Sequence, residues 1–500
     1  MRCPVWWRSL GEGPPEGGAP AVSCRVVMAN EGFDMGMRLA LFLVVVALLG
    51  GCGDDGGVST TESTASPTAS ATTAALATTS IAEPPTTTST SEPATTSFAT
   101  EPPTTSAPGD PDTGLVWARV PRDDSALGGV GEVAMMAVTA GGPGLVAVGW
   151  DGHFWGGEPA GMATVWTAPD GVTWTRVPHD DSVFGVPDST VMTAVTAGGP
   201  GVVAVGYEVD LSTDDRDAVV WASPDGLSWA RVPHDEAVFG GPSHQSMTGV
   251  AAGGPGLVAV GYDISTGSWP GGDWDAAVWV SSDGYAWSRV DGAVFGGPGR
   301  QVMTAVTAGG PGLVAVGYDT SSGDWRPAVW TSPDAVAWTR AADDDETLGG
   351  GMMLAVAAGG PGLVAVGHGG VTEGDDPDAV VWVSADGLVW ARVSHDESVF
   401  GGPGLQVMQA VVAVGPRLVA VGADDYGSGR DPDAAVWLSV DGDVWSRVPR
   451  DEAVSGGVGV QKMLGVVSGG PGLVAVGEDN ASGSGIGTFR PAAWVSPPPG

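Results

Sequence analysis

The sequence predicts an all-β protein, a seven-bladed β-propeller built from four-stranded blades. Three observations favour this fold. A unit of 50 to 57 residues recurs seven times, and each copy carries Gly-Gly-Pro-Gly-Leu-Val-Ala-Val-Gly or a close variant. Short Val- and Trp-rich runs are bounded by Gly, Pro and Asp turns, as β-strands commonly are. Small sheets that repeat at this pitch are typical of propellers.

Four strands are predicted in each unit, and the second unit shows them most clearly. Residues 192–197 form the inner strand, 202–207 the second, 218–223 the third and 227–232 the outermost. A helical solenoid is excluded because the units show no 3.6-residue periodicity and 82 of the 500 residues are glycine. In each unit, a methionine stands fourteen residues before the glycine that ends the Gly-Gly-Pro-Gly-Leu-Val-Ala-Val-Gly segment or its variant. The methionines are Met135, Met192, Met247, Met303, Met353, Met408 and Met463, and the glycines are Gly149, Gly206, Gly261, Gly317, Gly367, Gly422 and Gly477.

A hairpin turn with two flanking tryptophans joins the third strand to the fourth. In residues 218–229 the tryptophans stand eight positions apart, which places them nearly opposite on paired strands. The side chains of Ser223 and Asp225 can hold the backbone amides of the turn. The pattern resembles the Asp-box of sialidase-type propellers, although most copies are one residue short and Ala335 replaces the glycine in the fourth unit. The resemblance covers residues 112–500 and implies the fold rather than an activity.

The two ends of the repeat region predict how the ring closes. The last unit stops one strand short, and residues 114–120 repeat the sequence of the fourth strand in the fifth unit. We therefore expect this N-terminal strand to complete the C-terminal blade, which leaves no open sheet edge. Trp117 should lie beside Trp494, and Ser496 should meet Asp112 to complete an interrupted turn.

Residues 1–51 are interpreted as a doubtful N-terminal extension followed by a lipoprotein signal peptide. Arg38 precedes the apolar run 39–49, which is too short to span a bilayer and is typical of a signal-peptide core. Leu-Gly-Gly-Cys ending at Cys52 resembles a bacterial lipobox, which implies that Cys52 is lipidated. The expected location is the cell membrane, lipid-anchored and facing outside the cytoplasm. The alternative is an ordinary secretory signal followed by a chance cysteine.

Residues 52–111 are predicted to be a disordered tether between the anchor and the propeller at 112–500. From residue 58 onward the tether is rich in Thr, Ser, Pro and Ala and contains no Lys or Arg, so it cannot bury a core. The whole chain has a net charge of −38, which argues against nucleic acid and anionic lipid as partners. The protein is expected to be a monomer.

Any ligand site is expected on the propeller face that carries the variable loops. The first and third turns of each blade are nearly uniform, whereas the second loops differ, and residues that break a repeat are free to serve a ligand. Exposed aromatic side chains there can stack on sugar rings or anchor a protein partner. Their rings could equally fold over the blade ends. The candidates are Trp155, Trp269, Trp274, Trp325 and Tyr426.

A calcium site is the cofactor hypothesis for the same face. The position four residues before the third-strand tryptophan is acidic in four units, and a ring of carboxylates can bind calcium. The alternative is pairing with arginines and solvated loop charge. Histidines recur in three connections between blades as His-Asp-Asp/Glu, which indicates either loop tying or a metal site. The acidic candidates are Asp217, Asp275, Asp378 and Asp433, and the histidines are His179, His234 and His395.

No catalytic residue is assigned. A sialidase would need an arginine cluster, a tyrosine nucleophile with an acidic partner and a general acid. The arginines and most of the tyrosines fall on repeated positions, and residues 489–491 match a sialidase arginine motif only faintly. The predicted inner strands carry no charge. We therefore expect a non-catalytic propeller that binds an extracellular protein or glycan. The alternatives are a diverged sialidase-like glycoside hydrolase and a structural component of the cell envelope.

Overall fold

The computed structural model describes residues 115–497, apart from short gaps at 124–125, 129–131, 156–157, 187–188, 214, 242–243, 267–271, 342–344, 371–376, 426–430, 458 and 481–488. The predicted signal peptide, Cys52, the predicted tether and Asp112 lie outside the described residues. In the described part, no helix is long and apolar enough to cross a membrane. Two single-turn helices, α1 (Asp181–Phe184) and α2 (Asp345–Leu348), occur in connections between blades.

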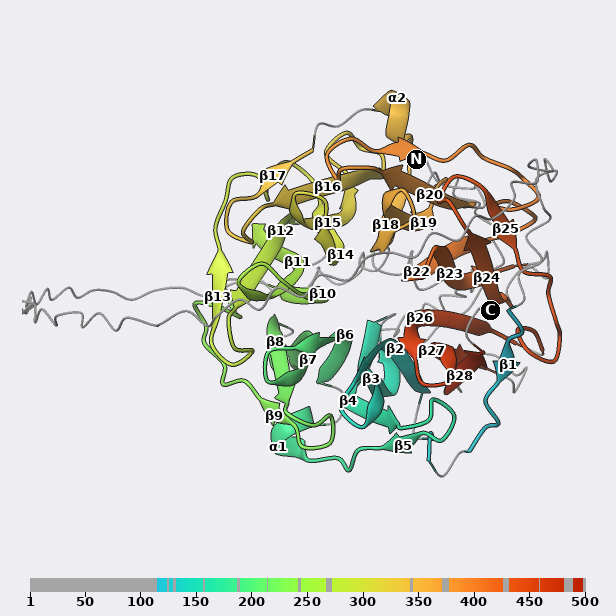
Figure 1. Cartoon of the computed structure of the whole chain (residues 1–500). Helices are drawn as coiled ribbons and strands as arrows, with labels where there is room; N and C mark the ends of the chain where they lie inside the picture. Colours follow the sequence, from blue (N-terminus) through green and yellow to red (C-terminus); the bar gives the residue numbers. More distant parts are fainter. Residues whose placement is uncertain are drawn as a thin grey trace, which may run out of the picture. The chain divides into compact units, whose positions relative to one another are not determined.

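Seven antiparallel four-stranded sheets are arranged as the blades of a propeller, which confirms the predicted fold (Figure 1). Blade one contains β2 (Glu132–Gly141), β3 (Gly144–Trp155), β4 (Glu158–Ala168) and β5 (Thr175–Arg176). Blade two contains β6 (Thr190–Gly198), β7 (Gly201–Asp210), β8 (Asp215–Ser223) and β9 (Ala230–Arg231). Blade three contains β10 (Gln245–Gly253), β11 (Gly256–Thr266), β12 (Asp273–Ser281) and β13 (Trp287–Val290). Blade four contains β14 (Gln301–Gly309), β15 (Gly312–Asp319), β16 (Arg326–Ser332) and β17 (Thr339–Arg340).

The remaining blades follow the same order around the ring. Blade five contains β18 (Met352–Gly359), β19 (Gly362–His368), β20 (Ala379–Ser384) and β21 (Ala391–Arg392). Blade six contains β22 (Gln406–Val414), β23 (Arg417–Asp424), β24 (Asp433–Ser439) and β25 (Trp445–Arg447). Blade seven contains β26 (Gln461–Gly469), β27 (Gly472–Asp479), β28 (Arg490–Ser496) and β1 (Ala118–Arg119). The hydrophobic core is divided into clusters between neighbouring blades, and the third-strand tryptophans of all seven blades are fully buried.

A β-bulge in every inner strand explains why methionine and glycine recur fourteen residues apart. In blade two, Met192 pairs with Gly206, and the register then shifts by one residue before Ala194. A Cβ atom on Gly206 would collide with the carbonyl oxygen of Val191. The equivalent glycine in each other blade faces the same obstruction. Glycine is therefore required where the two strands approach most closely at the bulge.

The hairpin between the third and fourth strands is held by the side chains that the sequence singles out. Ser223 Oγ accepts a hydrogen bond from the amide of Gly226 (2.8 Å), and Asp225 Oδ1 accepts from Ser228 N (2.7 Å). The indole nitrogen of Trp229 donates to the carbonyl of Gly226 (3.0 Å). These bonds hold residues 223–229 in a turn, so β9 is shorter than the predicted strand 227–232. We call this feature the Ser–Asp turn.

The ring closes as predicted, through pairing of β1 with β28 (Figure 1). Arg119 lies opposite Trp494, so Trp117 is displaced from Trp494 by two positions rather than lying directly opposite it. Both indoles belong to the core between blades six and seven, together with Leu115. Val120 belongs instead to the core between blades seven and one. The N-terminal strand therefore contributes to two inter-blade cores.

One expectation about the inner strands is wrong. These strands begin earlier than the sequence predicts, so β2 includes Glu132 and β26 includes Lys462. Lys462 is buried, and its ammonium nitrogen lies 3.7 Å from a carboxylate oxygen of Glu478 on the neighbouring strand. Charge is therefore present at the starts of these two inner strands.

Candidate functional site

The two propeller faces are built differently. On one face, first turns lie against the Ser–Asp turn of the following blade, as Pro143 lies against Gly226 and Pro200 against Gly284. Because these turns interlock, their sequences must stay uniform. The opposite face carries the second loops and the connections between blades, and we call it the variable face. The four acidic candidates, together with Trp274 and Trp325, come from segments on this face.

In six of the seven blades an ion pair, largely buried except in blade two, joins the second strand to the outer strand beneath the variable face. The carboxylate two residues after the bulge glycine, at the end of the second strand, pairs with the arginine of the outer strand. In four blades the same carboxylate also accepts a hydrogen bond from a glutamine at the start of the inner strand. The ion pairs are Arg119–Asp479, Arg176–Asp151, Arg231–Glu208, Arg289–Asp263, Arg340–Asp319 and Arg447–Asp424. The glutamines are Gln245, Gln301, Gln406 and Gln461. Sequence reasoning missed these glutamines, although each stands two residues before a repeated methionine.

The pKa values of the charged groups in these blades depend on how deeply each group is buried and on which groups it contacts. Burial raises the pKa of Asp319, but hydrogen bonds from Ser321 and the Arg340 guanidinium outweigh it, so the net shift is downward. In blade five Gly369 stands where the other blades have the carboxylate. Burial lowers the pKa of Arg392 there, and Asp378 opposes that shift. The repeated arginines thus serve the scaffold in the blades where their ion pairs are seen.

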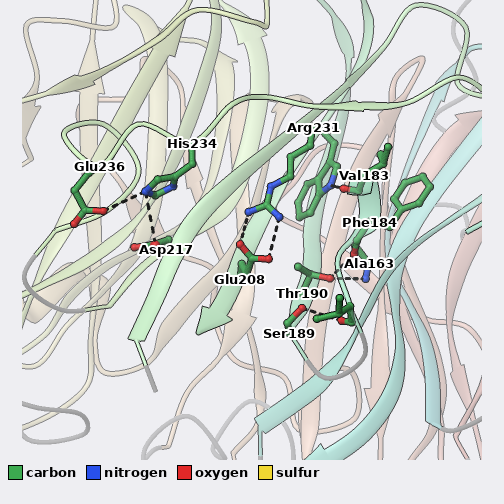
Figure 2. A network of polar contacts seen from close by, with 12 residues as sticks. Ala163, Val183, Phe184, Ser189, Thr190, Glu208, Asp217, Arg231, His234 and Glu236 are labelled. Carbon is green, nitrogen blue, oxygen red and sulfur yellow. Dashed lines mark hydrogen bonds and ion pairs between the residues drawn. The ribbon is translucent and has the colours of Figure 1, made fainter. Parts of the chain in front are cut away.

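The four predicted calcium ligands lie at equivalent positions on four blades, each in a separate cluster. Asp217 in β8 faces His234, with Asp217 Oδ2 3.9 Å from His234 Nε2 (Figure 2). Asp378 faces His395 in the same way, at 3.6 Å. Asp433 forms an ion pair with Arg450. Among the described residues, no metal-compatible group contains two of these aspartates, so the structure does not bring them together around one ion.

Asp275 lies in a different environment from the other three. The connection from Val290 to Phe295 is two residues shorter than its counterpart from Val232 to Phe239 and contains no histidine. A cavity of about 230 Å³ opens there, and Asp275, Asp263 and Arg289 line it. The shorter connection leaves uncovered the space that His234 and Glu236 occupy in blade two.

The structure describes the side chains of two aromatic candidates, Trp274 and Trp325, and both pack against neighbouring residues. Trp274 is fully buried, its ring stacks on Tyr262 with centroids 4.8 Å apart, and the guanidinium of Arg300 lies over the ring, 4.4 Å from its centroid. The expectation that Trp274 is exposed is therefore corrected, because Tyr262 and Arg300 cover its ring. Trp325 is half-buried, and its ring centroid lies 4.7 Å from that of Tyr318. Trp269, Tyr426 and the side chain of Trp155 lie outside the described residues.

The tyrosines at the repeated position are also packed into the structure. Tyr207, Tyr262 and Tyr318 follow the bulge glycines and are nearly fully buried. Burial raises the pKa of Tyr318 well above its usual value, which disfavours the phenolate. A neutral phenol is a weak nucleophile, so its burial argues against that role for Tyr318.

The class of protein defined by this architecture is the seven-bladed β-propeller. No protein-family model and no curated protein matches the chain. A protein of unknown function from Dyadobacter fermentans is 13% identical, with 76% of this chain and 99% of that chain covered and a TM-score of 0.40. A GH32 β-fructofuranosidase from Bombyx mori is 8% identical, with 76% and 90% covered and a TM-score of 0.30. Sqt1 from Chaetomium thermophilum is 13% identical, with 74% and 97% covered and a TM-score of 0.37.

Proposed function

We propose that this protein is a non-catalytic, lipid-anchored binding propeller that presents its variable face to a protein or glycan outside the cytoplasm. The observation that carries the proposal is the difference between the two faces. Interlocked uniform turns form one face, and the described ends of the second loops, whose sequences depart from the repeat, lie on the other. A surface that varies from blade to blade on a constant scaffold is suited to recognition.

Two finer assignments belong to this proposal. The Ser–Asp turns are Asp-box turns that serve the scaffold, supported by the hydrogen bonds of Ser223 and Asp225 with the turn amides. Cys52 carries the lipid, supported by the lipobox-like sequence that precedes it. Replacing Cys52 with Ala should release the protein from the membrane fraction. Retention of the variant with unchanged acyl labelling would contradict the anchor.

The binding proposal is tested with a glycan array and a pull-down from cell-envelope extracts, each with and without calcium. Trp325→Ala and Asp275→Asn alter the variable face, and Asp225→Asn alters a Ser–Asp turn as the matched control. Binding should weaken in the first two variants and persist in the control, with thermal melting used to verify folding. Equal loss of binding in all three folded variants would contradict the assignment of the face.

The alternative of a diverged glycoside hydrolase is tested separately. A fluorogenic sialoside is incubated with the parent protein and with Arg490→Ala. Under the non-catalytic proposal neither protein releases the fluorophore. Turnover that disappears in the Arg490→Ala variant would replace the binding proposal with an enzymatic one.

A further inference from the structure

We propose that blades two and five each bind one divalent transition-metal ion of the zinc type on the variable face. This inference does not rest on the proposed binding function. Each site combines the aspartate four residues before the third-strand tryptophan with a histidine and a glutamate from the connection that follows the blade. The residues of site two are Asp217, His234 and Glu236, and those of site five are Asp378, His395 and Glu397.

The spacing of the ligand atoms fits a single small ion. In site two, His234 Nε2 lies 3.1 Å from Glu236 Oε2 and 3.9 Å from Asp217 Oδ2 (Figure 2). In each site the three ligand atoms lie within 4.8 Å of one another. A tetrahedral ion with bonds of about 2.0–2.2 Å separates its ligand atoms by roughly 3.4 Å. Small rotations of the side chains therefore place all three atoms around one ion.

Site five repeats this geometry independently. His395 Nε2 lies 3.2 Å from Glu397 Oε2 and 3.6 Å from Asp378 Oδ2. In both sites a phenylalanine packs against the imidazole and restricts its orientation, with ring centroids 6.5 Å apart for His234–Phe239 and 6.3 Å for His395–Phe400. Each histidine thus directs Nε2 at the two carboxylates.

In blade six a positively charged side chain lies between the two carboxylates that correspond to the aspartate and glutamate of sites two and five. Its connection has Arg450 in place of the histidine, and this guanidinium pairs with Asp433 and with Glu452 (3.0 Å). A permanent cation therefore occupies the position between the equivalent carboxylates. In sites two and five an imidazole stands there, and its Nε2 can ligate a metal ion, which a guanidinium nitrogen cannot do. A divalent ion at this position would place positive charge between the two carboxylates, as Arg450 does in blade six.

Blade one provides the contrasting case. His179 contacts Asp181 (3.0 Å) as the other histidines contact their glutamates, but the third-strand position holds Met162 instead of aspartate. With one carboxylate fewer, this cluster has two protein ligands and should bind metal much more weakly. His179 is therefore a control that occurs naturally in the same chain.

The donor set selects the class of ion. Imidazole nitrogen with carboxylate oxygen suits zinc, cobalt and nickel, whereas calcium takes six to eight oxygen ligands. The remaining coordination position is open to solvent, because the glutamates are largely exposed. Arg392 lies close enough to Asp378 to act on it electrostatically. Its positive charge should make site five the weaker of the two.

Equilibrium dialysis of the full-length protein with zinc measures the number of ions bound, and Co²⁺ absorption reports tetrahedral coordination. We expect two ions per chain, the tighter one at site two. His234→Ala and His395→Ala should each remove one ion, whereas His179→Ala should leave two. Two ions retained in the double variant His234→Ala, His395→Ala would overturn the proposal, as would binding of calcium but not zinc.

A gain of binding gives an independent test. Arg450→His in blade six should create a third site with Asp433 and Glu452, raising the number of ions from two to three. Thermal melting in the absence of metal verifies that the variant is folded. A folded variant that still binds two ions would overturn the inference that Arg450 occupies the position of the metal.

Discussion

The guanidinium of Arg119 lies over the indole of Trp494, 5.7 Å from the ring centroid, although the two residues come from opposite ends of the propeller sequence. The same contact occurs within single blades, for example between Arg289 and Trp279 at 5.8 Å. The closing strand pair therefore reproduces an ordinary blade. A cation over an aromatic face adds to the apolar burial that holds the outer strands.

Deletion of residues 115–120 should destabilise the ring. It removes the buried side chains of Leu115, Trp117 and Val120 and exposes the edge of β28. Each such side chain stabilises the fold by roughly 1.5–3 kcal/mol, so the melting temperature should fall by at least about 5 °C. Differential scanning calorimetry measures the change. Deletion of residues 58–111 is the control and should leave the melting temperature unchanged. Equal melting of the two deletions would contradict this account of closure.

Alanine at a bulge glycine should be costly. The Cβ atom of Gly367→Ala would strike the carbonyl oxygen of Met352 on the inner strand, which cannot move without breaking the ladder. We expect the free energy of unfolding to fall by roughly 3 kcal/mol in urea denaturation. Gly350→Ala is the matched control from the same blade, because its nearest obstruction is the Trp325 carbonyl at 3.7 Å. A cost for Gly367→Ala no larger than that for the control would refute the bulge explanation.

The buried ion pairs should differ in strength according to their exposure. Asp424 is 1% exposed, pairs with Arg447 and accepts from Gln406 (3.0 Å). Asp424→Ala leaves Arg447 buried without this carboxylate and should cost about 3–5 kcal/mol. The pair Glu208–Arg231 is partly solvated, so Glu208→Ala should cost about 1 kcal/mol or less. Urea denaturation measures the loss in free energy of unfolding for both variants. Equal losses would show that burial does not determine how much each ion pair stabilises the fold.

The Ser–Asp turns should make stability depend on acid pH. Hydrogen bonds from the backbone amides of Ser228 and Leu227 lower the pKa of Asp225 below its ordinary value of 3.8. Because the folded-state pKa is the lower one, the carboxylate stabilises the fold above about pH 4, and this contribution is lost as the pH falls through the folded-state pKa. Asp225→Asn should therefore melt at a lower temperature than the parent at neutral pH, and the difference should shrink as the pH falls below the ordinary carboxyl pKa of 3.8.

A matched substitution separates the turn from general surface charge. Asp443 is exposed and follows the glycine of the Ser–Asp turn in blade six, so Asp443→Asn removes one negative charge without removing the carboxylate that caps the turn. Its melting temperature should equal that of the parent across the same pH range. If Asp443→Asn and Asp225→Asn behave alike, net charge rather than turn capping sets the acid response.

The repeat made most of the fold predictable. Blade number, strand order and closure follow from the spacing of methionine, glycine and tryptophan, because each blade uses the same local contacts. The exceptions are strand boundaries: the inner strands begin earlier than predicted. The turn bonds of Trp229 also extend the hairpin and shorten β9. The candidate site was less predictable. Sequence spacing marks Asp217 and His234 as repeated, but it cannot give the distance between residues that approach from different segments.

The sequence by itself determined the architecture, because turn glycines, buried tryptophans and strand periodicity act locally and recur in every blade. Tertiary structure decided which side chains became partners. Trp274 reads as a loop aromatic, yet Tyr262 and Arg300 cover it. Asp217 and Asp433 occupy the same repeat position, yet one meets a histidine and the other an arginine. These differences arise because the variable face is assembled from loops and connections whose contacts are set by packing between distant segments.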